Sequence, residues 1–166
     1  MPRKRWASVA LFILFVTFAS SVSHARHFAR VNIPGAHCGN GSPYSVWLDI
    51  KQRDKLMIEF MGGGACWSAQ SCYCVKLRTW MFPIPTLPTT SWIGNDLGPE
   101  SAHGLMADAS MIYFPYCTGD VHAGQHKADY GVVNAYHTGY SNVVRALRYL
   151  SDTGLVPFST FKQVVL

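Results

Sequence analysis

Three consecutive glycines, Gly62–Gly64, directly follow an apolar segment that has the composition of a buried strand. Because glycine has no side chain, such a run lets backbone N–H groups approach a substrate oxygen closely. Lipases and esterases use an HGGG-type loop in this way to bind the oxyanion of acyl transfer. A flexible turn is the alternative explanation for the glycines alone. Cys66 and Cys72 favour the oxyanion loop, because a disulfide between them would stabilise the adjoining loop by about 2 kcal/mol.

The N-terminus has the three regions of a secretory signal peptide. The basic stretch MPRKR precedes an apolar stretch around residues 9–19, and small residues stand at Ser23 and Ala25. The apolar stretch is shorter than the roughly 20 residues that a membrane-spanning helix needs. The sequence therefore predicts a signal peptide over residues 1–25, a protein secreted to the outside of the cell or to the periplasm, and no stable membrane insertion after cleavage. A retained anchor is the alternative.

The rest of the chain, residues 26–166, has the size and composition of one folded domain. Apolar residues make up 49% of the sequence and charged residues 14%, which argues against disorder. Three of the 14 Lys and Arg residues lie in the predicted signal peptide, and the remaining 11 against 9 Asp and Glu leave a net charge of +2. No run of basic residues is present in residues 26–166, so nucleic acid is not a predicted partner.

Cysteines are the next chemical signal. The chain has five: Cys38, Cys66, Cys72, Cys74 and Cys117. In an exported protein they are first of all disulfide candidates, and the odd number leaves one over or paired outside this chain. Zinc is the alternative, since CYC and HAGQH carry ligand side chains. These motifs lack the usual spacing of zinc sites, so the sequence predicts no metal and no cofactor.

Two strands are expected to position the glycine loop. Residues 44–50 alternate between apolar and polar types, and residues 55–61 are more continuously apolar and run into the glycines. The short QRD segment between these strands predicts that they lie side by side in the sheet. A helix over residues 68–81, with Ser68 as its N-cap, is expected after the loop.

The second half of the chain alternates between strands and helices. A long loop, a strand, a polar loop and a helix are predicted at residues 83–108, 110–115, 118–131 and 139–154. The helix is amphipathic, with Ser141 as its cap and Gly154 at its end. The final residues FKQVVL begin another strand of the apolar kind found in buried parallel sheets. This order predicts an α/β sheet with covered faces, and the chain is expected to be truncated within it.

Three segments of the chain resemble, in this order, signatures of the pectin acetylesterase and Notum family: CGNGSPYSVWLD, FMGGGACWSAQSC and PYCTGDVHAG. Members of that family have a Cys-x-x-Gly-Ser-Pro segment, a Gly-Gly-x-x-Cys oxyanion loop and a Pro-Tyr-Cys strand end followed by Asp-Val. They are secreted carboxylesterases with the α/β-hydrolase fold. The resemblance therefore implies that residues 26–166 form the N-terminal part of an α/β-hydrolase-like sheet flanked by helices.

The resemblance also implies a disulfide pattern. It pairs Cys66 with Cys72 and Cys38 with Cys117. The second pair closes a long loop and would contribute about 4–5 kcal/mol by loop entropy. Cys74 is left without an assigned partner.

Site residues are carried over in the same way. The resemblance places the oxyanion donors at the backbone N–H groups of Gly63 and Gly64. Trp67, Asp120 and His122 are candidates for lining the site. The alternatives are core packing for Trp67, the capping of its own turn for Asp120 and loop packing for His122.

A nucleophile is not found in the sequence. In the family the nucleophilic serine lies on a Gly-x-Ser-x-Gly elbow that follows the strand begun by FKQVVL. In α/β hydrolases the acidic residue and the histidine of the triad come after that serine in the chain. Ser141 opens a helix with no strand before it, and Ser42 precedes its strand. The resemblance therefore implies that the catalytic Ser, Asp and His lie beyond Leu166.

Three functional hypotheses follow. The preferred one is a fragment of a secreted serine-type carboxylic ester hydrolase, inactive alone, whose complete form deacetylates a polysaccharide or glycan. Its partner would be an acylated, in the first place acetylated, glycan or another ester. The alternatives are a non-catalytic secreted binding domain derived from the same fold and an unrelated disulfide-stabilised interaction domain.

Overall fold

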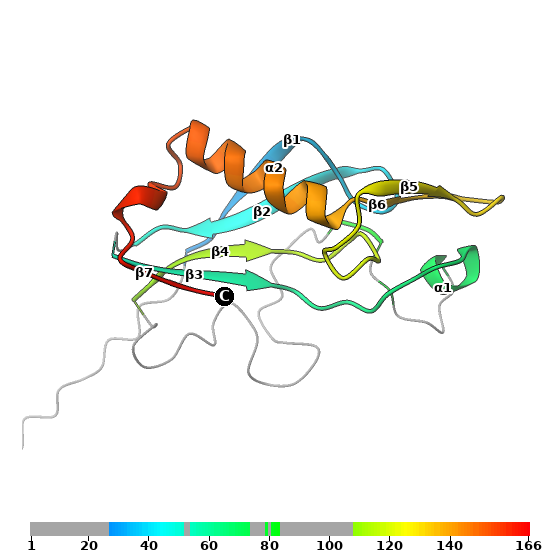
Figure 1. The fold of residues 1–166 in the computed structure, drawn as a ribbon, viewed down its shortest axis with the longest axis horizontal. Coiled ribbons are helices and arrows are strands. Elements are labelled where there is room, and N and C mark those ends of the chain that lie inside the picture. Colours follow the sequence, from blue (N-terminus) through cyan, green and yellow to red (C-terminus); the bar gives the residue numbers. More distant parts are fainter. Residues whose placement is uncertain (1–26, 52–53, 74–78, 80, 84–107) are drawn as a thin grey trace, which may run out of the picture.

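A five-stranded mixed sheet in the strand order β1-β2-β4-β3-β7 forms the centre of the computed structural model, and α2 packs against the sheet at β1 (Figure 1). The structure describes residues 27–51, 54–73, 79, 81–83 and 108–166. The strands are β1 (Ala29–His37), β2 (Pro43–Asp49), β3 (Lys55–Phe60), β4 (Ser110–Phe114), β5 (His126–Asp129), β6 (Asn134–His137) and β7 (Gln163–Val165). The helices are α1 (Ala69–Tyr73), α2 (Gly139–Asp152) and the 3-10 turn η2 (Phe158–Thr160).

The strand order corrects one prediction. β2 and β3 are not neighbours, because β4 lies between them, antiparallel to β2 and parallel to β3. Ile112 of β4 is the register partner of Leu48 on one side and Ile58 on the other. All five residues of β4 are buried, and a central position in the sheet is what buries both faces of a strand.

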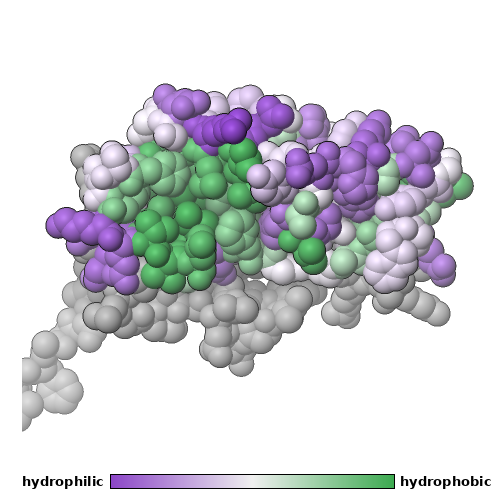
Figure 2. All heavy atoms as spheres, viewed as in Figure 1, coloured by the Kyte–Doolittle hydropathy of each residue, from purple (hydrophilic) through white to green (hydrophobic). Residues whose placement is uncertain are grey.

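The expected strand at the C-terminal end is confirmed as β7, which runs parallel to β3 with Leu56 opposite Val164. It is the last strand of the sheet, and Val164 is 52% exposed. The α/β class is therefore confirmed for the described residues. In Figure 2 apolar side chains gather in one large area below α2.

Two parts of the fold have no counterpart in the sequence-based expectation. Buried and exposed side chains do not alternate regularly along β1, because its register shifts between Asn32 and His37 and Gly35 adopts a φ of +70°. β5 lies within the expected polar loop over residues 118–131 and pairs with β6, which follows that loop, in a separate two-stranded sheet. The side chains of β5 are mostly exposed and polar, so the segment lacks the apolar alternation on which strand prediction depends.

The helix α2 confirms the predicted helix but not its cap. Thr138 is the N-cap, and Ser141 lies within the first turn. Gly154 follows the helix with a φ of +69°, the left-handed conformation that commonly ends helices. Asn142 fastens α2 to β1, since its side chain donates to the carbonyl of His37 (2.8 Å) and accepts from the N–H of the same residue (3.3 Å).

The helix expected over residues 68–81 is much shorter. α1 ends at Tyr73, and Met81 is not helical. The capping role of Ser68 is confirmed, because its Oγ accepts a hydrogen bond from the N–H of Ser71 (3.2 Å).

Several expectations lie outside the described residues: the signal peptide over residues 1–25, most of the loop over residues 83–108, and Cys74. Among the residues that are described, no helix is both long and apolar enough to cross a membrane.

Candidate functional site

The glycine loop leaves the sheet at the carboxyl end of its central parallel strands. The last ladder bond runs from the N–H of Met61 to the carbonyl of Phe114 (2.9 Å), and Gly62–Gly64 follow it. The loop then rejoins the segment after β4, where the N–H of Cys66 donates to the carbonyl of Gly119 (2.9 Å). Ligand sites of α/β sheets lie at this end of the strands.

The backbone amides of the glycine loop have no hydrogen-bond partner in the part of the chain that the structure describes. Among the described residues, none of the N–H groups of Gly62, Gly63 and Gly64 donates a hydrogen bond. Gly64 has a φ of +81°, which glycine adopts without strain. Gly63 is buried, whereas the glycines on either side of it are exposed. Unpaired N–H groups in such a position are the donors that an oxyanion hole requires.

The carbonyl groups of the same loop are held from both ends. His122 contacts the carbonyl of Met61 through Nε2 (2.9 Å), and the hydroxyl of Tyr116 donates to the carbonyl of Gly64. The N–H of Val121 donates in turn to the Tyr116 hydroxyl (2.8 Å). The loop is therefore anchored through its acceptors while its donors stay unbonded.

Asp120 organises the segment that supplies both anchors. Its Oδ1 accepts from the Thr118 hydroxyl (2.6 Å) and the His122 N–H (3.1 Å). Its Oδ2 accepts from the N–H groups of Gly124 (3.1 Å) and Gly139 (2.6 Å). One carboxylate thus connects the turn after β4 to the first residue of α2, in agreement with the predicted turn-capping role.

Backbone strain is concentrated in this turn. Val121 and His122 have φ angles of +50° and +59°. The left-handed region is unfavourable for non-glycine residues and most of all for a β-branched one. The hydrogen bonds to the Asp120 carboxylate and the Tyr116 hydroxyl hold both residues there, and the His122 side chain thereby reaches the glycine loop.

The protonation states of the two anchoring side chains follow from their surroundings. Burial lowers the pKa of His122, against smaller opposing effects of the Met61 carbonyl and of Asp120, so the ring is neutral near pH 7. A carbonyl only accepts hydrogen bonds, so Nε2 carries the proton. The ring packs against Phe60 and Tyr116, with centroids 5.3 and 5.0 Å apart. Burial raises the pKa of Tyr116 to about 12, and its hydroxyl stays protonated.

The predicted lining residues therefore have different positions. His122 positions the loop through its contact with the Met61 carbonyl, and Asp120 positions His122 by accepting a hydrogen bond from its N–H. Trp67 is 73% exposed, so core packing is the wrong explanation for this residue. Tyr116 was not a predicted site residue, although it lies in the Pro-Tyr-Cys signature, two positions after the end of β4.

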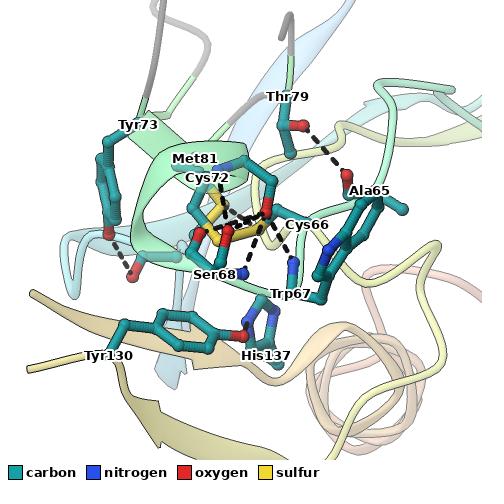
Figure 3. The surroundings of a disulfide bond; sticks show 12 residues. Ala65, Cys66, Trp67, Ser68, Cys72, Tyr73, Thr79, Met81, Tyr130 and His137 are labelled. Carbon is teal, nitrogen blue, oxygen red and sulfur yellow. Dashed lines mark hydrogen bonds between the residues drawn. A yellow bond between two sulfur atoms is a disulfide. The ribbon is translucent and has the colours of Figure 1, made fainter.

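The structure joins Cys66 to Cys72 and Cys38 to Cys117, as the resemblance implies, with Cα–Cα distances of 4.9 and 5.0 Å. Figure 3 shows the Cys66–Cys72 bond beside the buried Met81, whose Sδ lies 3.6 Å from the Cys66 Sγ.

A possible metal cluster lies at the same place. Ligand atoms of Cys66, Cys72 and His137 lie within 4.8 Å of one another. The two sulfurs are bonded to each other, however, and both ring nitrogens of His137 have partners. Nδ1 contacts the Thr118 carbonyl (2.8 Å), and Nε2 contacts the Tyr130 hydroxyl (2.9 Å; Figure 3). The cluster therefore packs the glycine loop against β6.

The serines considered as nucleophiles do not form a catalytic pair. Ser141 lies in the first turn of α2, and the Ser42 hydroxyl donates to the side chain of Asn40. Neither is hydrogen bonded to a histidine in the part of the chain that the structure describes.

Comparison with known proteins places these features in a family. The structure of the Wnt deacylase Notum from Drosophila is similar in fold, with a TM-score of 0.57 and 20% sequence identity. The match covers 78% of this chain and 39% of the Notum chain, so the chain spans about two-fifths of that protein's length. A search of curated protein sequences finds no match. The family model for pectinacetylesterases matches residues 20–165, and on that match the chain belongs to the pectinacetylesterase family.

Proposed function

We propose that this chain supplies the oxyanion-binding part of the active site of a secreted carboxylic ester hydrolase. The observation that carries the proposal is the glycine loop, whose amides are unbonded while its carbonyls are anchored by His122 and Tyr116. In the proposed mechanism the N–H groups of Gly63 and Gly64 donate to the oxygen that becomes negatively charged when an ester carbonyl is attacked. The amide of the residue after the nucleophile would supply the remaining donor.

The rest of the machinery is proposed to lie outside this chain. A serine hydroxyl attacks the acyl carbon and gives its proton to a histidine, which then protonates the leaving alcohol. We place that serine after β7, because β7 is parallel to β3 and the chain covers only 39% of Notum. The chain alone is therefore expected not to hydrolyse p-nitrophenyl acetate above an unrelated protein control.

The proposed substrate is an acetylated glycan, for which the family description is the support. Secretion is supported by the two disulfides, since such bonds form and persist in oxidising compartments. The gene read past the codon for Leu166 gives the first check. A nearby stretch encoding Gly-x-Ser-x-Gly supports the proposal, whereas a stop codon without one favours a non-catalytic binding protein.

The decisive experiment measures acetate release from acetylated pectin by the protein continued through that stretch. Gly63→Pro removes one proposed donor, and we expect kcat to fall about 100-fold or more, which corresponds to roughly 3 kcal/mol of transition-state stabilisation. Gly62→Pro is the matched control in the same loop, and it should lose less than about tenfold. Equal losses in the two variants would show that Gly63 is not an oxyanion donor.

A further inference from the structure

A groove of about 500 Å³ is lined mainly by residues of α2, and no residue of the glycine loop contributes to it. The helix forms one wall, and Pro34 of β1 and Gln125 of the loop after Asp120 contribute to the other side. In Figure 2 hydrophilic side chains gather along the upper edge of the molecule, above the apolar area. No part of the proposed acyl chemistry uses this groove.

The groove presents two positively charged side chains that have no partner among the described residues. Arg145 and Arg148 line it and are exposed, and neither forms an ion pair or hydrogen bond with another described residue. Residues three apart on a helix have Cβ atoms about 5–6 Å apart, so both guanidinium groups serve one extended ligand. Asp152 also lines the groove and carries the opposite charge, but it does not neutralise Arg148 by contact.

The backbone of β1 leaves room for one of these arginines. Gly35 has a φ of +70°, and a Cβ atom at this position would lie 3.4 Å from the nearest guanidinium nitrogen of Arg145. A larger residue would press on that guanidinium. The arginine therefore lies against bare backbone with its charge at the groove.

Two tyrosines accompany the arginines. Tyr140 and Tyr149 line the groove nine residues apart, which is about 13 Å along the helix axis. A tyrosine ring offers an apolar face for packing and a hydroxyl for hydrogen bonds. A guanidinium group offers a planar fork that matches a carboxylate. The tyrosines and arginines together suit a chain of ring-shaped units that each carry a carboxylate better than they suit a single small anion.

We propose that the groove binds the carboxylates of an acidic glycan built from uronic acids, at a site separate from the acyl pocket. One end of the groove adjoins the segment that anchors the glycine loop, because the N–H of Tyr140 donates to the carbonyl of Gly124 (3.1 Å). A glycan held there would lie next to that segment. The choice of an acidic glycan rests on the proposed function, whereas the groove itself does not.

The test is direct binding of hexagalacturonate to the chain, measured by isothermal titration calorimetry without any hydrolysis. We expect Arg145→Gln/Arg148→Gln to weaken binding at least tenfold, since glutamine keeps the helix but not the charge. Lys127→Gln/Lys162→Gln is the control, because it removes the same charge from exposed positions outside the groove. The fully methyl-esterified hexamer should also bind the unmodified protein at least tenfold more weakly.

The proposal would be overturned by no binding at millimolar hexagalacturonate, by equal weakening in the two double variants, or by equal affinity for the esterified hexamer. Equal affinity for a glutamate hexapeptide would likewise overturn it, by showing a general anion surface. No acetyl group is cleaved in the binding experiment, so its outcome does not depend on the esterase proposal. A failure to bind hexagalacturonate would likewise not affect the test of Gly63 as an oxyanion donor.

Discussion

At the scale of single residues, Asp120 determines the geometry of the candidate site more than any group within the glycine loop itself. Its carboxylate accepts hydrogen bonds from one hydroxyl and three backbone N–H groups. Two of those donors flank a turn in which Val121 and His122 adopt left-handed conformations. The strain is tolerated because the acceptor is charged and fully occupied.

Replacing Asp120 by Asn should destabilise the protein by about 2 kcal/mol, since an amide nitrogen would then face a backbone donor. Urea denaturation followed by fluorescence measures the change. Asp129→Asn is the control, because this exposed side chain accepts a single hydrogen bond, from the N–H of Gly131 (2.8 Å). A loss of stability in the control as large as that in the Asp120 variant would contradict this account.

His122 predicts a pH dependence of stability. Burial lowers its pKa in the folded state, so the unfolded chain takes up the proton more readily, with a pKa near 6.5. The stability that depends on the neutral ring is therefore present above about pH 6.5 and is lost as the pH falls through the lower pKa of the folded state. His122→Gln keeps a donor for the Met61 carbonyl but does not titrate.

Melting temperatures of the two proteins between pH 8 and pH 5 check this prediction. The Tm of the unmodified protein should fall more steeply toward acid than that of the Gln variant, because all other titrating groups are shared. Parallel curves would mean that the His122 ring is not desolvated in solution.

At the scale of elements, the segment after β4 must pass close to the Cys66–Cys72 disulfide. Gly119 has a φ of +66°, and a Cβ atom there would lie 2.5 Å from the Cys66 Sγ and 2.6 Å from the Met81 Sδ. Gly131, in the turn between β5 and β6, has a similar φ of +81° and no atom within 4 Å of such a Cβ. The two glycines share a backbone conformation and differ in packing.

Gly131→Ala should therefore cost only the backbone penalty of about 1 kcal/mol. Gly119→Ala adds a steric overlap with sulfur atoms in a buried cluster, and we expect it to cost at least about 2 kcal/mol more. Denaturation midpoints of the two variants give the difference. Equal midpoints would mean that the disulfide and Met81 move aside freely.

At the scale of the whole molecule, the two disulfides constrain very different lengths of chain. Cys38 and Cys117 are 79 residues apart and connect the end of β1 to the segment after β4. Cys66 and Cys72 are 6 residues apart and hold only the turn around α1. Loop entropy makes the long closure worth about 4.5 kcal/mol and the short one about 2 kcal/mol.

Replacing each pair with alanines should therefore destabilise the protein unequally, with Cys38→Ala/Cys117→Ala the more severe. Urea unfolding of both double variants, compared with the unmodified protein, measures the two losses. If the short-range pair proves at least as costly, its contribution comes from packing around Met81 and His137 and not from chain entropy.

The sequence determined the features that depend on neighbouring residues. Glycines at Gly62–Gly64 mark the loop, helical periodicity marks α2 and Gly154 marks its end, and local motifs imply the family and the disulfide pairs. Each is encoded within a few residues, or in motifs that can be compared without a structure.

The tertiary structure decided what depends on distant contacts. Only the fold places β4 between β2 and β3. The short link between β2 and β3 suggests in the sequence that these two strands pair with each other. Burial of both faces of β4, however, favours a position for β4 at the centre of the sheet. Only the fold brings His122 to the Met61 carbonyl, 61 residues away, and Gly139 to the Asp120 carboxylate. The glycine composition of the loop can be read from neighbouring residues. The hydrogen bonds that anchor the loop come from residues far away in the sequence, because a backbone carbonyl accepts from whichever donor the packing brings near.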